Sequence, residues 1–298
     1  NENLIGVRIK PGEEIGDSIR VIRYLFAQLC HQNDQGITGV KGFESNLTID
    51  RILEGEINTI AIAGTLAVDS RGITAYRNLE NPPSYTITVF KELLEKSGIR
   101  LDGEIKIGIS PLDSVIELGV HYSKPLIEIL YYMNKTSSNF VSEQVLKTLG
   151  AAFKSEPGTS EEGINVIKDF ISQTGIDSTK YRAVDGSGLS TYDILSPSQI
   201  VNLLVFMFKS FEYQPEYLTS LPVSGIDGTL RKRMNEPIIL RQVRAKTGTL
   251  SRASCLSGYA ITKRREIVAF SIMINNFLGD VNSIREIQDK ICKALVNL

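Results

Sequence analysis

Residues 243–260, VRAKTGTLSRASCLSGYA, carry the pattern that decides the fold of the second half of the chain. Thr and Val favour strands, so the stretch predicts an antiparallel hairpin with strands over residues 241–249 and 253–262. Lys246 followed by Gly248 is unusual in a strand, because an interior glycine weakens it and often marks close approach of another backbone or ligand. Alone, Lys-Thr-Gly is a weak indicator, and its meaning depends on the rest of the chain.

The elements around this hairpin are helices before it, and a third strand and a last helix after it. The last strand covers residues 266–276, and the amphipathic helix that follows carries Ile284, Ile287, Ile291 and Leu295. Helical spacing of apolar residues predicts helices over residues 123–135, 139–150, 159–175 and 196–210. Capping boxes open the last two, with Thr159 before Glu162 and Ser196 before Gln199. Helices and an antiparallel sheet that are separate along the chain indicate an α+β fold.

The first hundred residues mix strand and helix signals. Apolar residues at helical spacing predict a helix over residues 16–32, and strands follow over 57–68, broken at Gly64, and 73–79. The turn at residues 81–84 (NPPS) precedes a helix that ends near Gly98, and residues 99–111 predict a strand. We therefore place a domain boundary between residues 109 and 110.

Composition excludes several classes of function. The 298 residues are 42% hydrophobic with a net charge of −1, so nothing points to nucleic acid or an anionic membrane, and the apolar runs are too short for a membrane span. Three cysteines and two histidines are too few and too scattered for a disulfide framework or a metal centre. We expect no metal and no cofactor.

Two polar loops accompany the Lys-Thr-Gly run. Ser137, Ser138 and Asn139 form a corner between two helices, and the stretch VDGSGLSTYD begins at Val184. Each alone is typical of an ordinary turn or cap. Asp185 stands where a Gly-x-Ser-x-Gly nucleophile elbow needs its first glycine, and no well-placed histidine follows, so a Ser-His-Asp triad is excluded.

Ser-x-Asn on a helical corner, followed by Lys-Thr-Gly on a strand, is the motif order of penicillin-recognising serine acyltransferases. From about Asn81 to near its end the chain resembles the class C low-molecular-mass D-alanyl-D-alanine carboxypeptidase/endopeptidase family, the penicillin-binding protein 4 type. The stretches that carry the resemblance are SKPLIEILYYMNKTSSNFVSE, VDGSGLS, LPVSGIDGTLRKRM and VRAKTGTLSRASCLSGYA.

The resemblance implies a penicillin-binding/β-lactamase-like transpeptidase fold, an antiparallel sheet with a helical cluster. Residues 110–298 would be the C-terminal part of that catalytic domain. Residues 1–109 would be the remainder of the mixed α/β domains that this family inserts into it. The implied substrates are peptidoglycan stem peptides, the implied inhibitors are β-lactams, and the implied location is the periplasm or another exported compartment.

Three catalytic roles follow from the resemblance. Ser137 matches the serine whose hydroxyl helps to move a proton to the leaving amine. Asn139 matches the asparagine whose amide hydrogen-bonds the substrate backbone. Lys246 supplies positive charge for the substrate carboxylate and tunes proton affinities around the site.

The resemblance also implies substrate-binding residues. The hydroxyls of Thr247 and Thr249 would bind the carboxylate, Gly248 would let the substrate lie along the strand, and the Thr249 N–H would donate to the oxyanion. Ser187 and Gly188 are expected to line the pocket. Ser138, the middle residue of Ser-x-Asn, receives no role.

The family's nucleophile lies in a Ser-x-x-Lys motif, and no serine of these 298 residues has a lysine three positions later. We expect the chain to be the C-terminal portion of a longer enzyme and to be inactive alone, with the missing N-terminal segment as a partner. The alternatives are a non-catalytic peptidoglycan-binding protein and an envelope interaction protein. A further alternative is that Ser137 is itself the nucleophile, with Lys135 or Lys246 as its base.

Overall fold

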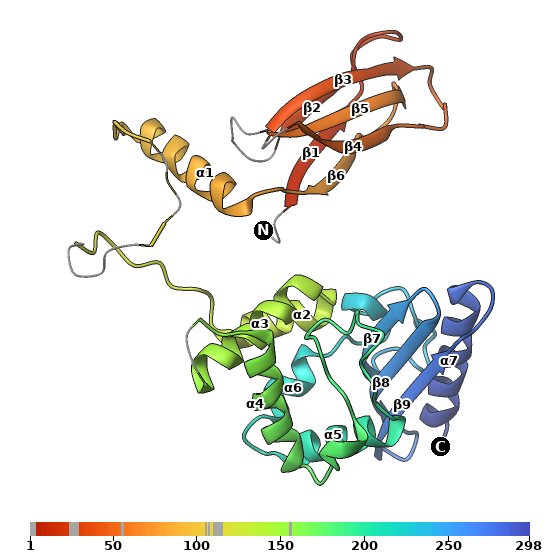
Figure 1. Cartoon of the computed structure of the whole chain (residues 1–298). Helices are drawn as coiled ribbons and strands as arrows, with labels where there is room; N and C mark the ends of the chain where they lie inside the picture. Colours follow the sequence, from red (N-terminus) through yellow and green to blue (C-terminus); the bar gives the residue numbers. More distant parts are fainter. Residues whose placement is uncertain are drawn as a thin grey trace. The chain divides into compact units, whose positions relative to one another are not determined.

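The computed structural model describes residues 4–23, 30–54, 57–104, 106, 108–109, 116–154 and 157–298. It divides into two compact units, Asn1–Gly119 and Val120–Leu298 (Figure 1). The division between the units lies further along the chain than the predicted boundary.

Among the described residues of the first unit there are two three-stranded sheets and one helix. In the order β2-β1-β6, an antiparallel sheet joins Arg20–Arg23, Leu4–Lys10 and Ile73–Asn78. In the order β3-β5-β4, the other sheet joins Cys30–Gly39, Ile57–Ala67 and Thr48–Glu54, and its β3–β5 pair is parallel. Helix α1 (Pro82–Lys96) begins after the Asn81 cap, and its Tyr85 joins the core of this unit.

Two predicted elements of the first unit are wrong. Residues 16–32 contain β2 and the start of β3 in place of a helix, while 24–29 lie outside the described residues. Ile19 and Val21 join the core while Ile22 is exposed, so the two-residue alternation of a strand overrides the helical spacing. The predicted strand over 99–111 is also absent among its described residues. Ile99, Leu101 and Ile109 are exposed there, because no neighbouring strand covers them.

Gly64 does not break its strand as predicted, because β5 continues through it. Its φ is +108°, and a Cβ there would lie 2.6 Å from the carbonyl oxygen of Asn46. The glycine therefore permits a close backbone contact inside the unit.

The second unit confirms the predicted order of helices, hairpin, third strand and last helix, with these bounds: α2 (Leu126–Thr136), α3 (Asn139–Phe153), α4 (Ser160–Ser172), α5 (Pro197–Lys209), α6 (Gln214–Ser220), β7 (Val243–Leu250), β8 (Ala253–Ile261), β9 (Ile267–Asn275) and α7 (Val281–Val296). Two short 3₁₀ helices, η2 (Ser178–Lys180) and η3 (Gly228–Leu230), lie in the connections. Both predicted capping boxes are present.

Helix α3 passes through Gly150, where it was predicted to end. A Cβ at Gly150 would lie 2.7 Å from the carbonyl oxygen of Thr159, the residue that caps α4. The glycine therefore lets α4 begin against α3.

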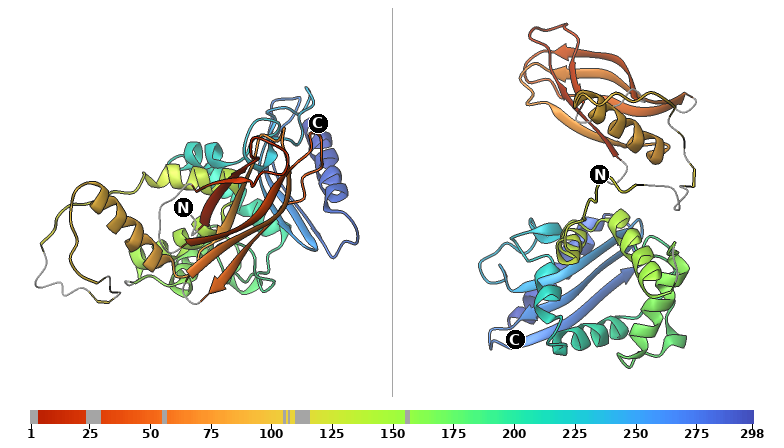
Figure 2. Two further views of the ribbon diagram at one scale, coloured as in Figure 1. Left: turned by 90° about the horizontal axis from the view of Figure 1, so that it is seen from above. Right: turned by 90° about the vertical axis from the view of Figure 1, so that its left-hand side faces the viewer.

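The strands of the second unit form an antiparallel sheet in the order β7-β8-β9, with helices on both faces (Figures 1 and 2). Leu256 and Phe270 pack with Cys292 and Val296 of α7 on one face. On the other face Tyr259 packs with Leu204 of α5, and its hydroxyl donates to the Leu204 carbonyl at 2.7 Å.

The buried face of α7 differs from the prediction. Gln288, Cys292 and Val296 are buried, whereas Ile287 and Ile291 are 46% and 40% exposed. The sheet therefore selects a face that is rotated from the most apolar one.

Candidate active site

The Ser-x-Asn corner connects α2 to α3. Ser137 follows the end of α2 in a left-handed conformation, with φ 56° and ψ 49°, and its N–H donates to the Met133 carbonyl. Ser138 caps α3, and its Oγ accepts a hydrogen bond from the Val141 N–H at 3.3 Å. The structural role of the corner thus belongs to Ser138, while Ser137 and Asn139 on either side line a cleft.

Lys246 of β7 reaches this corner. Its Nζ donates to Ser137 Oγ at 2.6 Å and to the Thr247 carbonyl at 2.8 Å. Burial lowers the pKa of Lys246 from the ordinary lysine value, because desolvation disfavours the charged form. The ammonium is therefore placed to exchange a proton with the Ser137 hydroxyl.

Lys135, the other lysine considered as a base for Ser137, is committed elsewhere. It is buried, and its Nζ donates to both carboxylate oxygens of Asp227 at 2.8 and 2.9 Å and to the Leu221 carbonyl at 2.6 Å. This ion pair fastens the last turn of α2 to the segment that leads into η3, and so fixes the position of Ser137.

The rest of the Lys-Thr-Gly-Thr run forms one wall of the cleft. Thr247 Oγ1 donates to Thr229 Oγ1 at 2.9 Å. Gly248 pairs with Cys255 on β8 and is exposed, and a Cβ built there would meet only Cys255, at 3.8 Å. The space above Gly248 is thus open.

The loop with Ser187 and Gly188 is held by two carboxylates. Glu143 of α3 accepts hydrogen bonds from the N–H groups of Gly186 and Ser187 at 3.1 and 2.9 Å. Asp185 accepts from the N–H of Gly188 at 2.5 Å. Asp185 therefore serves the loop geometry, which agrees with the exclusion of a nucleophile elbow.

All eight predicted site residues line a single cleft of about 780 Å³. They come from the α2–α3 corner, the Val184–Asp193 loop and β7, and they are Ser137, Asn139, Ser187, Gly188, Lys246, Thr247, Gly248 and Thr249. Sequence reasoning missed the far side of the cleft, where Thr229, Arg233 and residues of α7 lie. The stretch LPVSGIDGTLRKRM held a signal for Thr229 and Arg233, since it carried part of the family resemblance without an assigned role.

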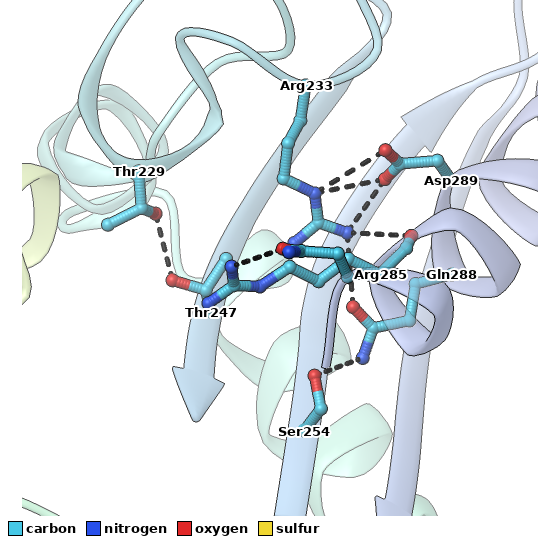
Figure 3. Close-up of polar contacts among 8 residues, drawn as sticks. Thr229, Arg233, Thr247, Ser254, Arg285, Gln288 and Asp289 are labelled. Carbon is cyan, nitrogen blue, oxygen red and sulfur yellow. Dashed lines mark hydrogen bonds and ion pairs between the residues drawn. The ribbon is translucent and has the colours of Figure 1, made fainter. Parts of the chain in front are cut away.

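A polar network braces that far side (Figure 3). Arg233 donates to Asp289 of α7, with its closest contact at 2.7 Å, and to Gln288 at 3.1 Å. Gln288 is fully buried and donates to Ser254 Oγ of β8 at 3.1 Å. The network ties the segment after η3 to α7 and to the sheet.

Within the described ranges, no group of three or more His, Cys, Asp and Glu side chains could hold a metal ion. No helix in those ranges is both long and apolar enough to cross a bilayer.

Comparison with known proteins identifies the family of the chain. A family described as the D-Ala-D-Ala carboxypeptidase 3 (S13) family matches residues 1–298. A D-alanyl-D-alanine carboxypeptidase of Actinomadura sp. (strain R39) is 34% identical over 254 residues, which cover 83% of this chain and 46% of the relative. The D-alanyl-D-alanine carboxypeptidase DacB of Haemophilus influenzae is 27% identical over 229 residues, 76% of this chain and 47% of the relative. This chain thus spans about half the length of these relatives.

Solved structures show the same fold. Penicillin-binding protein 4 (dacB) of H. influenzae superimposes with a TM-score of 0.75 at 21% identity, over 99% of this chain and 66% of that one. The same protein in complex with a β-lactam gives a TM-score of 0.73 at 21% identity, over 99% of this chain and 70% of that one. The predicted penicillin-binding fold is confirmed.

Proposed function

Since the chain belongs to the D-Ala-D-Ala carboxypeptidase 3 (S13) family, we propose that it is the substrate-recognising part of a serine D-alanyl-D-alanine carboxypeptidase/endopeptidase. The observation that carries this proposal is the 2.6 Å contact between Lys246 Nζ and Ser137 Oγ in the cleft that Asn139 and Thr247 also line. The substrates are peptidoglycan stem peptides that end in D-Ala-D-Ala, and β-lactams occupy the same cleft.

In this proposal a Ser-x-x-Lys segment outside the 298 residues supplies the nucleophile. Its serine oxygen attacks the carbonyl carbon of the penultimate D-Ala, and the serine proton passes to the lysine of that motif. The tetrahedral oxyanion accepts hydrogen bonds from the N–H of the nucleophile and from the N–H of Thr249. Each such donor lowers the barrier by about 3–4 kcal/mol.

Collapse of the tetrahedral intermediate breaks the C–N bond. The Ser137 hydroxyl, hydrogen-bonded to Lys246, passes its proton to the leaving amine and regains one from the protonated lysine of Ser-x-x-Lys. The terminal D-Ala or cross-linked partner therefore leaves neutral at nitrogen. Water then hydrolyses the acyl-enzyme ester and restores the serine. Covalent catalysis thus divides one difficult step into two easier ones.

The first unit and the location complete the proposal. Asn1–Gly119 is a separate compact unit, which suits a domain inserted between Ser-x-x-Lys and Ser-x-Asn. Because stem peptides lie outside the cytoplasmic membrane, the protein works in the periplasm or another exported compartment.

The test uses the full-length protein that contains both these residues and the Ser-x-x-Lys segment. We expect it to release D-alanine from a peptide that ends in D-Ala-D-Ala, to leave a D-Ala-L-Ala control intact, and to be inhibited by benzylpenicillin. A folded protein that carries Ser-x-x-Lys and releases no D-alanine would exclude the carboxypeptidase.

One observation favours the alternative of a non-catalytic peptidoglycan-binding protein: no serine of the 298 residues has a lysine three positions later. The full-length sequence and the mode of β-lactam binding distinguish the two functions. The binding protein lacks Ser-x-x-Lys altogether and releases β-lactam on dilution, whereas the enzyme retains it as an ester.

A further inference from the structure

Arg285 of α7 lines the cleft together with Lys246, Thr247 and Thr249, although it belongs to none of the recognised motifs. It lies in the second turn of α7 and is half-buried. In Figure 3 its side chain extends from the helix toward Thr247. A guanidinium here faces the strand whose threonine hydroxyls are the proposed carboxylate ligands.

The charge of Arg285 is not neutralised by an ion pair within the described residues. Its Nη1 donates to the neutral Asn282 Oδ1 at 3.2 Å, and no carboxylate pairs with it there. The neighbouring arginine differs, because Arg233 is bound to Asp289 at 2.7 Å and is only 14% exposed at its side chain. The two arginines therefore differ. Arg233 is bound within the wall of the cleft, whereas Arg285 has N–H groups that donate no hydrogen bond within the described residues.

Neighbouring residues hold the backbone of Arg285 and one nitrogen of its guanidinium. Its carbonyl oxygen accepts a hydrogen bond from Arg233 Nη2 at 3.3 Å, and the adjacent Gln288 is fully buried against Ser254. Asn282, one turn earlier on α7, holds Nη1. A planar guanidinium that is half-buried and held from one side can bind a carboxylate through two parallel hydrogen bonds.

We propose that Arg285 binds the carboxylate of the residue that leaves the substrate, opposite the hydroxyls of Thr247 and Thr249. The assignment rests on the proposed function and makes the site selective for substrates whose leaving residue carries a free α-carboxylate. Lys246 then does not have to neutralise the substrate carboxylate alone, and its Nζ can exchange a proton with Ser137.

The experiment compares two peptides that differ only in the terminal group, one ending in D-Ala-D-Ala acid and one in D-Ala-D-Ala amide. The full-length protein is assayed as wild type, R285M, R285K and R264M. Arg264 is an exposed arginine in the turn between β8 and β9, away from the cleft, and serves as the matched control.

We expect R285M to lower kcat/KM for the acid by about 10- to 100-fold, mainly through KM, since a hydrogen bond to a charged group contributes that much discrimination. The amide should be turned over at the wild-type rate, which also shows that the variant folds. R285K should recover part of the loss, and R264M should match wild type with both peptides.

An unchanged acid-to-amide preference in R285M would overturn the assignment alone, and so would an equal loss on both peptides, which indicates a structural role. Failure of the wild type to turn over either peptide would overturn the proposed function, and this assignment with it.

Discussion

At the residue scale, short sequence motifs predicted the lining residues on one side of the cleft. The residues on the other side were found only in the structure. Ser137, Asn139 and Lys246 were identified from motif order, and the structure places them around one cleft. Arg285 could not be found in this way, because its proposed role depends on α7 bringing it to the cleft that β7 also lines. Ser138 and Lys135 show the reverse: they sit beside motif residues in sequence but act on the fold.

The protonation of Lys246 leads to a pH prediction. Since burial lowers its pKa below the ordinary value of 10.5, the contribution of Lys246 to the positive charge at the carboxylate site is lost as pH rises through that lowered pKa. KM for a D-Ala-D-Ala peptide should therefore rise with pH at a pH below 10.5. In K246R the guanidinium stays charged, so this rise should disappear. A KM that climbs identically in K246R would assign the titration to another group.

Removal of the Lys246 side chain tests its proton-transfer role. We expect K246M to slow acylation by benzylpenicillin about 100- to 1000-fold, the usual contribution of a positioned proton-transfer group. Stopped-flow measurement of acylation in the full-length protein checks this. K263M, at an exposed lysine of the β8–β9 turn, is the control and should acylate at the wild-type rate. A K246M rate within a factor of three of that control would contradict the role.

At the element scale, the predictions that held rest on local chemistry. The capping boxes of α4 and α5 use neighbouring residues only, so the sequence identifies where these helices begin. The errors depend on tertiary packing. Residues 16–32 have apolar residues at helical spacing, yet Ile19 is buried and Val21 partly buried in the core that the strands form. The sheet likewise selects Gln288, Cys292 and Val296 of α7 in place of Ile287 and Ile291.

The joint between α2 and η3 depends on the Lys135–Asp227 ion pair. Lys135 is 6% exposed, so K135M leaves Asp227 without its cation and should destabilise the protein by about 3 kcal/mol. The control K154M breaks the ion pair between Lys154 and Asp169, which is more exposed than the Lys135–Asp227 pair. This change should cost less than about 1 kcal/mol. Urea unfolding measures both. Equal effects would show that the Lys135 pair contributes no more than a surface pair.

The Val184–Asp193 loop should respond to pH through Asp193. Burial, and secondarily the Asp185 charge, raise the pKa of Asp193 above 3.8, and Oδ2 has no hydrogen-bond partner in the part of the chain that the structure describes. The folded state then binds more protons than the unfolded state between pH 3.8 and the raised pKa. Stability conferred by this group is therefore present below pH 3.8 and is lost as pH rises through that window.

The substitution D193N removes this titration, while the side-chain oxygen can still accept the hydrogen bond from the Val184 N–H. The Tm of D193N minus that of wild type should therefore increase as pH rises above 3.8. D177N provides a control of opposite sign, because hydrogen bonds from Thr179 lower the pKa of Asp177 to about 2. Its difference from wild type should become more negative between about pH 2 and 4. A Tm difference between D193N and wild type that stays constant with pH would refute the assignment of this titration to Asp193.

At the scale of the whole molecule, the chain consists of two compact units. Arg100 and Lys106 are exposed and lie between α1 and α2, outside any helix or strand. Limited trypsin digestion should therefore cut there first and yield a resistant C-terminal fragment that begins after one of these residues and carries the cleft. Mass spectrometry of the fragments checks this. Simultaneous loss of both units, with no resistant fragment, would show that neither is stable alone.

The central claim is that these 298 residues recognise the D-Ala-D-Ala group while the acylated serine lies outside them. The most direct measurement is the intact mass of the 298-residue chain after incubation with benzylpenicillin, with the full-length protein in parallel. The account predicts an unchanged 33.0 kDa mass for the chain and one added penicillin on a Ser-x-x-Lys serine in the full-length protein. A penicillin adduct on Ser137, or on any other serine of the 298 residues, would contradict it.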